Sequence, residues 1–105
     1  HTLLAAWRGD TILGIGGLRR VPEEYAEIKR MYVIPEARGG SVASRILEQL
    51  ESTAREEGFR TIRLETGNAQ PGAIRFYEKH GYRRRGAFGR YAENPYSVFM
   101  EKTLL

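Results

Sequence analysis

The chain contains no cysteine and only two histidines among its 105 residues. The lack of cysteine excludes disulfides, thiolate metal sites and catalysis through a cysteine acyl-enzyme. His1 and His80 do not have the spacing of a metal-binding pair, so we expect no metal site. A chain without cysteine also fits a reducing compartment, and we expect a cytoplasmic protein.

Long hydrophobic runs are missing as well. No segment approaches the run of about 18 apolar residues that a membrane-spanning helix needs. The N-terminus has no basic segment followed by an apolar core, so we expect no signal peptide. Because the chain begins at His1 without a methionine, we interpret residues 1–105 as a single domain that belongs to a longer protein.

Charge of either sign is present in ordinary amounts. The chain has 17 basic and 13 acidic residues, a net charge of +4, and 41% hydrophobic residues. This composition is typical of a folded globular domain. The positive balance fits either an ordinary surface or a polyanionic partner, which would be a phosphorylated cofactor or a nucleic acid.

The first third of the chain reads as three strands. Apolar residues 3–7 and 12–18 flank a Gly-Asp turn and predict an antiparallel hairpin, and the glycines of the second run indicate a bulge or a close backbone approach. Residues 26–34 predict a third strand. Strict alternation gives this strand two mixed faces, one of Glu27, Lys29, Met31 and Val33 and the other of Ile28, Arg30 and Tyr32.

The rest of the chain alternates between helices and strands. Residues 41–57 predict a helix with Gly58 as its stop and an apolar stripe formed by Val42, Ile46, Leu47, Leu50 and Ala54. The same spacing predicts that polar residues of this helix, Glu51 among them, lie on the opposite side. Residues 61–66 predict a strand, 71–80 a second helix, and 82–85 and 97–103 two final strands. The order β-β-β-α-β-α-β-β predicts an α/β (α+β) fold with one mostly antiparallel sheet.

The connection between the third strand and the first helix has the features of an anion site. Glycines let backbone N–H groups approach a ligand, the helix start adds unpaired donors, and Arg38 adds a guanidinium suited to phosphate. An ordinary glycine turn with Ser41 as helix N-cap is the alternative. The sequence lacks both the P-loop and the G-x-G-x-x-G dinucleotide motif.

Two segments of the chain resemble the GNAT family of acetyl-CoA-dependent N-acetyltransferases. Residues 38–43, RGGSVA, are similar to the family signature Arg/Gln-x-x-Gly-x-Gly/Ala and follow a strand that ends in an aromatic-Val pair. Residues 73–82, AIRFYEKHGY, are similar to the second signature, Ala-x-x-x-Tyr-x-x-x-Gly-Phe/Tyr. Three departures stand out: Ser41 replaces a glycine, Gln70 replaces an asparagine, and the N-terminal strand and helices of the family are missing.

The resemblance implies transfer of acetyl from acetyl-CoA to a primary amine. It implies that Glu27 acts as general base and Tyr77 as general acid, although an exposed strand glutamate paired with Lys29 or Arg63 and a core tyrosine are the plainer interpretations. The implied coenzyme A contacts are Met31, Tyr32, Val33, Arg38, Gly39, Gly40, Ser41, Val42, Ala43, Gln70, Ala73 and Tyr77.

Several questions stay open on the sequence. The acceptor is a small-molecule or peptide amine of unknown identity, and residues 88–96 either contact it or simply pack onto the domain. Residues 83–85, three arginines, either reach an acidic substrate or form a solvated basic run.

A non-catalytic CoA-binding domain, or a fragment that needs a partner chain, is one alternative function. A small nucleic-acid-binding module is another, although we expect no nucleic-acid partner. The missing first strand suggests a homodimer.

Overall fold

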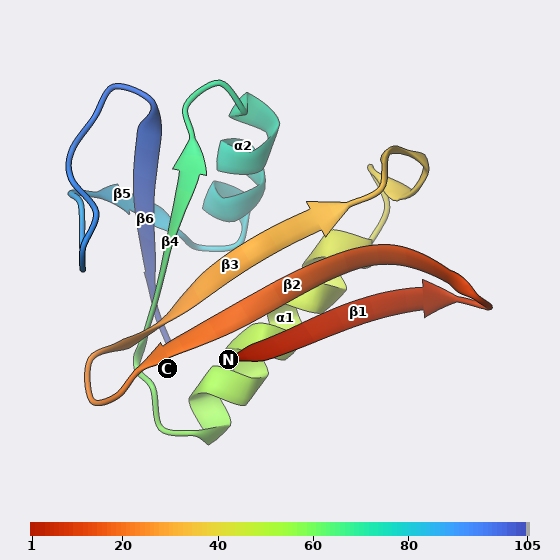
Figure 1. Ribbon diagram of the computed structural model, residues 1–105, viewed down its shortest axis with the longest axis horizontal. Helices are drawn as coiled ribbons and strands as arrows, with labels where there is room; N and C mark the ends of the chain where they lie inside the picture. The colour runs from red at the N-terminus through yellow and green to blue at the C-terminus, as the bar shows by residue number, and fades with distance from the viewer. Residues whose placement is uncertain (105) are drawn as a thin grey trace.

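Six strands form one sheet with two helices packed on it (Figure 1). The computed structural model describes residues 1–104. The strand order is β1-β2-β3-β4-β6-β5, and only β3 and β4 run parallel, because α1 carries the chain across between them. The elements are β1 (Thr2–Arg8), β2 (Thr11–Val21), β3 (Tyr25–Val33), α1 (Val42–Glu56), β4 (Thr61–Gly67), α2 (Pro71–Lys79), β5 (Arg83–Arg85) and β6 (Ser97–Thr103). The predicted order and fold class are confirmed.

The main core lies between the sheet and both helices. Helix α1 buries most of its predicted stripe, and Gly58 ends it at φ 89° as expected. One polar residue behaves differently from the prediction. Glu51, placed on the outer side of the helix by its spacing, is buried, and its carboxylate accepts hydrogen bonds from the Tyr82 hydroxyl at 2.7 Å and from Lys102 Nζ at 2.9 Å.

A β-bulge divides β3 into two parts. Ile15 and Gly17 of β2 pair with Tyr32 and Lys29, so the single residue between them faces two residues of β3, Arg30 and Met31. Arg30 has a left-handed φ of 57°. The extra residue reverses the alternation beyond it.

The predicted faces of β3 are therefore wrong. Met31 packs against the helix-covered core together with Ile28, and it does not share a face with Glu27 and Lys29. Tyr32 lies half exposed on the other side and does not share a face with Ile28. A pattern of period two cannot locate a bulge, because the extra residue leaves no apolar or polar signature of its own.

The bulge also ends the pairing of β3 with β4. The parallel register runs from Ala26–Ile62 to Ile28–Leu64 and stops there. Beyond this point the arrowhead ends of β3 and β4 point apart in Figure 1. The sheet therefore opens on one edge of β3, next to the start of α1.

The chain between β5 and β6 covers part of the sheet face opposite the helices, over β3 and β6. Phe88 from this loop is buried against Tyr25 and Phe99, and Tyr91 packs at the edge of the same cluster. The rings meet edge to face at centroid distances of 5.2–5.8 Å. Residues 88–96 thus pack onto the domain and also form one wall of the pocket described below.

Close approach of α1 to β2 depends on Gly16, which lies opposite the bulge. A Cβ at this position would stand 2.6 Å from both Ile46 Cγ2 and Met31 Sδ. We expect Gly16→Ala to lower the free energy of unfolding by about 1–3 kcal/mol, because the packed helix cannot retreat freely. Denaturant unfolding followed by circular dichroism measures the change.

Gly72 in α2 provides the matched control. A Cβ there meets no atom within 4 Å and the residue is helical. Gly72→Ala should therefore stabilise the protein by about 0.5–1 kcal/mol. Equal effects of the two substitutions would contradict the packing argument.

Candidate active site

The gap between β3 and β4 is a pocket of about 320 Å³. It runs from the buried carboxylate of Glu27 past the bulge to the start of α2. Its lining includes Glu27, Met31, Thr66, Gln70, Tyr77 and Tyr91. The pocket therefore brings together both predicted catalytic residues, Glu27 and Tyr77, with Met31 and Gln70 from the predicted cofactor contacts.

Backbone N–H groups of β3 point into this gap. The Ile34 amide donates to Leu13 O at 2.9 Å on the β2 side. Because N–H groups alternate along a strand, the amides of Val33 and Met31 point to the opposite side, where β4 no longer pairs. These two amides are free for an extended ligand that lies along β3.

The loop before α1 forms an open turn at the end of the same gap. It begins with the 3₁₀ turn Pro35–Ala37, and Gly39 adopts φ 84°. Among residues 1–104, the amides from Gly39 to Ala43 donate to no protein acceptor, and Ser41 takes the N-cap position without a side-chain cap bond. A Cβ on Gly39 would meet nothing within 4 Å, so no side chain fills the turn.

Arg38 supports this loop from one side. Its Nε donates to Val33 O at 2.8 Å, and its guanidinium lies 5.3 Å from the centroid of the Tyr32 ring. Both contacts hold the guanidinium against the end of β3, and the unpaired amides follow directly in the chain. The amides at the helix start are suited to an anion, and Arg38 adds a positive charge at the same loop.

Glu27 is a buried charge with three partners. Its carboxylate is 1% exposed, and it accepts hydrogen bonds from the Tyr91 hydroxyl at 2.6 Å and from Arg19 Nη1 at 3.3 Å. Lys29 Nζ lies 3.8 Å from the same carboxylate. The expectation that Glu27 is exposed is therefore wrong. Of its two expected partners, Lys29 forms an ion pair with it, whereas Arg63 pairs with Glu101 instead.

Tyr77 projects from α2 into the gap. The side chain is mostly buried, and burial raises its pKa to about 12. Among residues 1–104, the phenol makes no hydrogen bond. The hydroxyl therefore keeps its proton at neutral pH and faces the pocket without a protein partner.

Tyr91 is a site residue that the sequence did not single out. Burial and the hydrogen bond to the Glu27 carboxylate raise the pKa of Tyr91, so its hydroxyl stays protonated and donates. Lys29 Nζ in turn donates to the Tyr91 oxygen at 3.3 Å. The residue lies 64 positions from Glu27, and only the folded loop brings the two together.

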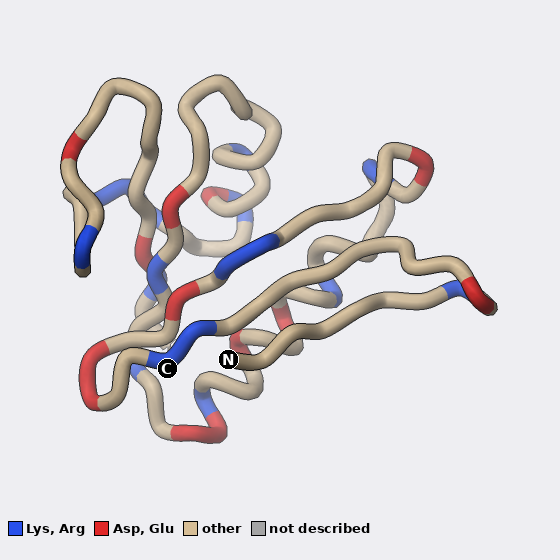
Figure 2. The backbone as a smooth tube through the Cα atoms, viewed as in Figure 1, with Lys and Arg blue, Asp and Glu red and all other residues tan. Residues whose placement is uncertain are grey.

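A second pocket, of about 460 Å³, lies on the other side of Glu27. It shares Glu27, Lys29 and Tyr91 with the gap between the strands, and Arg90 of the β5–β6 loop also lines it. Figure 2 shows an acidic stretch of β3 beside a basic stretch of β2, followed along β3 by a second basic stretch. The two pockets meet at a single carboxylate.

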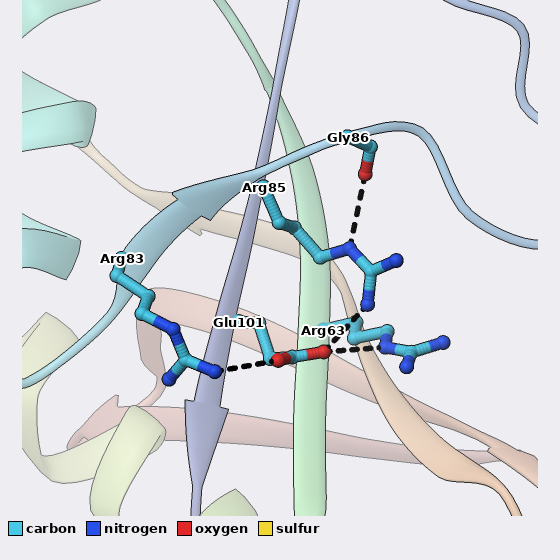
Figure 3. Close-up of polar contacts among 5 residues, drawn as sticks. All are labelled: Arg63, Arg83, Arg85, Gly86 and Glu101. Atoms are coloured by element: carbon cyan, nitrogen blue, oxygen red, sulfur yellow. Dashed lines mark hydrogen bonds and ion pairs between the residues drawn. The ribbon is translucent and has the colours of Figure 1, made fainter.

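The arginine run of β5 is engaged within the protein. Glu101 of β6 accepts hydrogen bonds from Arg63 Nε at 2.8 Å, Arg83 Nη2 at 2.9 Å and Arg85 Nη1 at 2.6 Å (Figure 3). The Arg85 Nε also donates to Gly86 O. Arg83 and Arg85 are thus ion-paired within the protein, while Arg83 and Arg84 also lie exposed to solvent.

Comparison with known proteins identifies the family. The sequence profile of the acetyltransferase (GNAT) family matches residues 1–82. The chain is 45% identical over 102 residues to the "IAA acetyltransferase" of Azospirillum brasilense, covering 96% of this chain and 67% of that protein. The chain belongs to the GNAT acetyltransferase family.

Solved structures agree with this assignment of the GNAT chain. A Klebsiella pneumoniae protein described as an acyl-CoA N-acyltransferase superposes with a TM-score of 0.93 at 39% identity, over 98% of this chain and 72% of the other. A Bacillus anthracis protein described as a streptothricin acetyltransferase, solved with acetyl coenzyme A, gives a TM-score of 0.84 at 26% identity, over 97% and 61% of the two chains.

The GNAT chain spans about two thirds of the length of the curated relatives it matches, 67% and 70% for two of them. Residues 1–104 contain no cluster of three or more His, Asp or Glu side chains that could hold a metal ion. No helix in this part of the chain is long and apolar enough to cross a membrane.

The Glu101 cluster generates a pH prediction. Burial acts to raise the pKa of Glu101, but the hydrogen bonds from Arg63 and Arg85 outweigh it and lower the pKa below its usual 4.5. A lowered folded pKa contributes stability that is present above pH 4.5 and is lost as the pH falls through the folded value. We expect Glu101→Gln to cost about 1–2 kcal/mol of unfolding free energy at pH 7 and much less at pH 3.

Urea titrations at the two pH values measure this difference. Glu78→Gln is the control, because Glu78 is exposed on α2 and makes no ion pair among the described residues. A cost of Glu101→Gln that does not change with pH would contradict the ionic interpretation.

Proposed function

We propose that the protein transfers the acetyl group of acetyl-CoA to a primary amine in a ternary complex. The observation that carries the proposal is the meeting of two pockets at Glu27: one has free backbone amides and an anion site, and the other is open on the acceptor side. The thioester supplies an activated acetyl carbonyl. The residues of this chain position the two reactants and move protons.

The coenzyme A site extends from the loop before α1 along β3. The free amides of residues 39–43 and the Arg38 guanidinium bind the diphosphate, with the positive end of the α1 dipole behind them. The Met31 and Val33 amides bind the pantetheine arm as a neighbouring strand would. Gln70 lines the gap between β3 and β4, and the resemblance to the family adds Tyr32 and Ala73 to the proposed contacts. The residues present fit the group because the turn is open and its donors are unpaired.

Glu27 is the proposed general base. An amine of pKa near 10 is almost fully protonated at neutral pH and cannot attack a carbonyl. The carboxylate takes one proton from the ammonium, and the freed nitrogen lone pair forms the new C–N bond. As the C–S bond breaks and coenzyme A leaves as a thiolate, the nitrogen loses its second proton to solvent water and becomes the amide. Tyr91 and Arg19 hold the carboxylate in place through their hydrogen bonds. Tyr91 is a positioning residue in this scheme.

Tyr77 is the proposed acid for the departing sulfur. Its pKa of about 12 lies above that of a thiol, near 8.5, so full proton transfer to the sulfur is uphill. The larger contribution of the phenol is therefore a hydrogen bond donated to the developing thiolate. Its unpartnered hydroxyl in the pocket supports this role.

A CoA-binding domain that lacks turnover is the second candidate. Leu3 is 61% exposed and Trp7 is 59% exposed on β1, at the edge of the sheet. Large exposed apolar side chains beside an unpaired strand favour a further chain segment or subunit at this edge. Binding of coenzyme A without acetylation of any amine would favour this candidate.

The anion site can be tested by calorimetric titration with acetyl-CoA. Ser41→Glu places a carboxylate among the free amides and should weaken binding at least about tenfold, a cost of about 1.4 kcal/mol. Gln49→Glu adds the same charge on the exposed side of α1 and should leave the affinity within about twofold. Equal affinities of the two variants would remove the phosphate site from the proposal.

The catalytic roles can be tested by steady-state kinetics. Glu27→Gln should lower kcat by about 10²–10⁴-fold, because it removes the group that takes the proton. Tyr77→Phe should lower kcat by roughly 10- to 100-fold, because it removes one hydrogen bond to a charged group. Both variants should retain the affinity for acetyl-CoA. Glu24→Gln, in the same pocket as Glu27, and Tyr96→Phe, 76% exposed, are the controls. A variant that keeps the parent kcat would exclude its residue from the chemistry.

A further inference from the structure

The pocket on the acceptor side of Glu27 has more positive than negative charge. Arg19, Lys29 and Arg90 line it, against the carboxylates of Glu24 and Glu27. The Arg19 and Lys29 side chains are 41% and 42% exposed, so their charges reach the pocket. A pocket built only for a cationic amine would carry the opposite balance.

Within the pocket, the negative charge of Glu27 is already compensated. Arg19 Nη1 lies 3.3 Å from its carboxylate, Lys29 Nζ lies 3.8 Å away, and Tyr91 donates a hydrogen bond to it. Arg90 is different. It is exposed, it lines the same pocket, and within residues 1–104 it makes no ion pair, hydrogen bond or ring contact. The pocket thus holds a guanidinium without a counter-ion, close to the proposed base.

We propose that the acceptor is a small amine that also carries a carboxylate, of the amino acid kind. Its amine lies at Glu27 and its carboxylate lies at Arg90. This inference rests on the proposed acetyl transfer and names the class of acceptor for it. The volume of about 460 Å³ is that of a small-molecule site.

The charges favour this class for a second reason. Cations near an amine lower the pKa of its ammonium form, because a like charge disfavours protonation. Arg19 and Lys29 therefore help Glu27 to produce the neutral nucleophile, while the carboxylate of the acceptor offsets the repulsion that the cations exert on it. A polyamine has no such group, and the excess of positive charge in the pocket disfavours it.

The walls of the pocket accommodate a carbon side chain. Its lining includes Val21, the buried Tyr25 ring and Tyr91. Arg63 stacks on the Tyr25 ring at 4.5 Å and forms an ion pair with Glu101, and it does not line the pocket. An aliphatic or aromatic amino acid thus matches both the charge and the lining.

Matched pairs of acceptors test the proposal. Acetylation of L-phenylalanine is compared with 2-phenylethylamine, and L-leucine with 3-methylbutylamine, with spermidine as the polycation. We expect kcat/KM to be roughly 10- to 100-fold higher for the acid in each pair, as for a charged hydrogen bond, and lowest for spermidine. Equal kcat/KM within both pairs would overturn the inference.

Arg90→Gln separates recognition from intrinsic reactivity. The amines of amino acids are less basic than simple alkylamines. This difference alone raises kcat/KM for the acid, in the parent protein and in the variant alike. The variant should therefore reduce the acid-to-amine ratio of kcat/KM by roughly tenfold or more, chiefly through KM. Arg84→Gln is the control, because Arg84 is exposed and lies outside the pocket. A ratio unchanged in Arg90→Gln, or reduced equally in Arg84→Gln, would overturn the inference.

Calorimetry distinguishes a wrong acceptor class from a wrong proposal of acetyl transfer. L-Phenylalanine and 2-phenylethylamine are titrated into protein saturated with coenzyme A, a readout that does not need turnover. Tighter binding of the acid that is lost in Arg90→Gln supports the inference, and equal or absent binding overturns it. Acetylation of simple amines without preference would leave the proposed function standing, whereas a protein that does not bind coenzyme A would remove both.

Discussion

The separation of β3 from β4 beyond Ile28 is the constraint on which the rest of the structure depends. A continuous parallel ladder would satisfy the backbone of β3 on both sides and leave no room for a ligand. The left-handed Arg30 breaks that ladder, and Gly16 lets the helix pack closely opposite the break. Backbone strain at one residue is thus offset by core packing around it, and the unpaired edge becomes a binding surface.

A buried carboxylate follows from the same geometry. Glu27 occupies the last paired part of β3, where the sheet is still closed, and it is 1% exposed. Burial of an isolated charge is unfavourable, and the surrounding hydrogen bonds from Arg19 and Tyr91 make it tolerable. Because the sheet opens immediately beyond it, the carboxylate lies between two pockets. The polar partners hold the carboxylate where the two pockets adjoin, together with Lys29 and Tyr91, which line both.

Much of the fold was predictable because it depends on local signals. The stripe of α1, its glycine stop and the Gly-Asp hairpin were all visible as periodicity or turn chemistry, and the structure confirms them. The errors have one physical origin. The faces of β3, the burial of Glu51 and the ion pairs of Arg83 and Arg85 are set by neighbours distant in sequence. Periodicity counts positions along one element and has no access to such neighbours.

For the candidate site, the sequence by itself determined the family, the glycine-containing loop before a helix and the two residues proposed for proton transfer, whose roles stay predictions. These are short motifs, and their chemistry resides in the residue types and their spacing. Only the tertiary structure decided that Tyr91 contacts Glu27, that Arg63 turns to Glu101, and that Arg90 has no counter-ion among the described residues. The loop that carries Tyr91 and Arg90 has no regular period. Its position follows from the burial of Phe88 against two strands, a contact that exists only after the chain has folded.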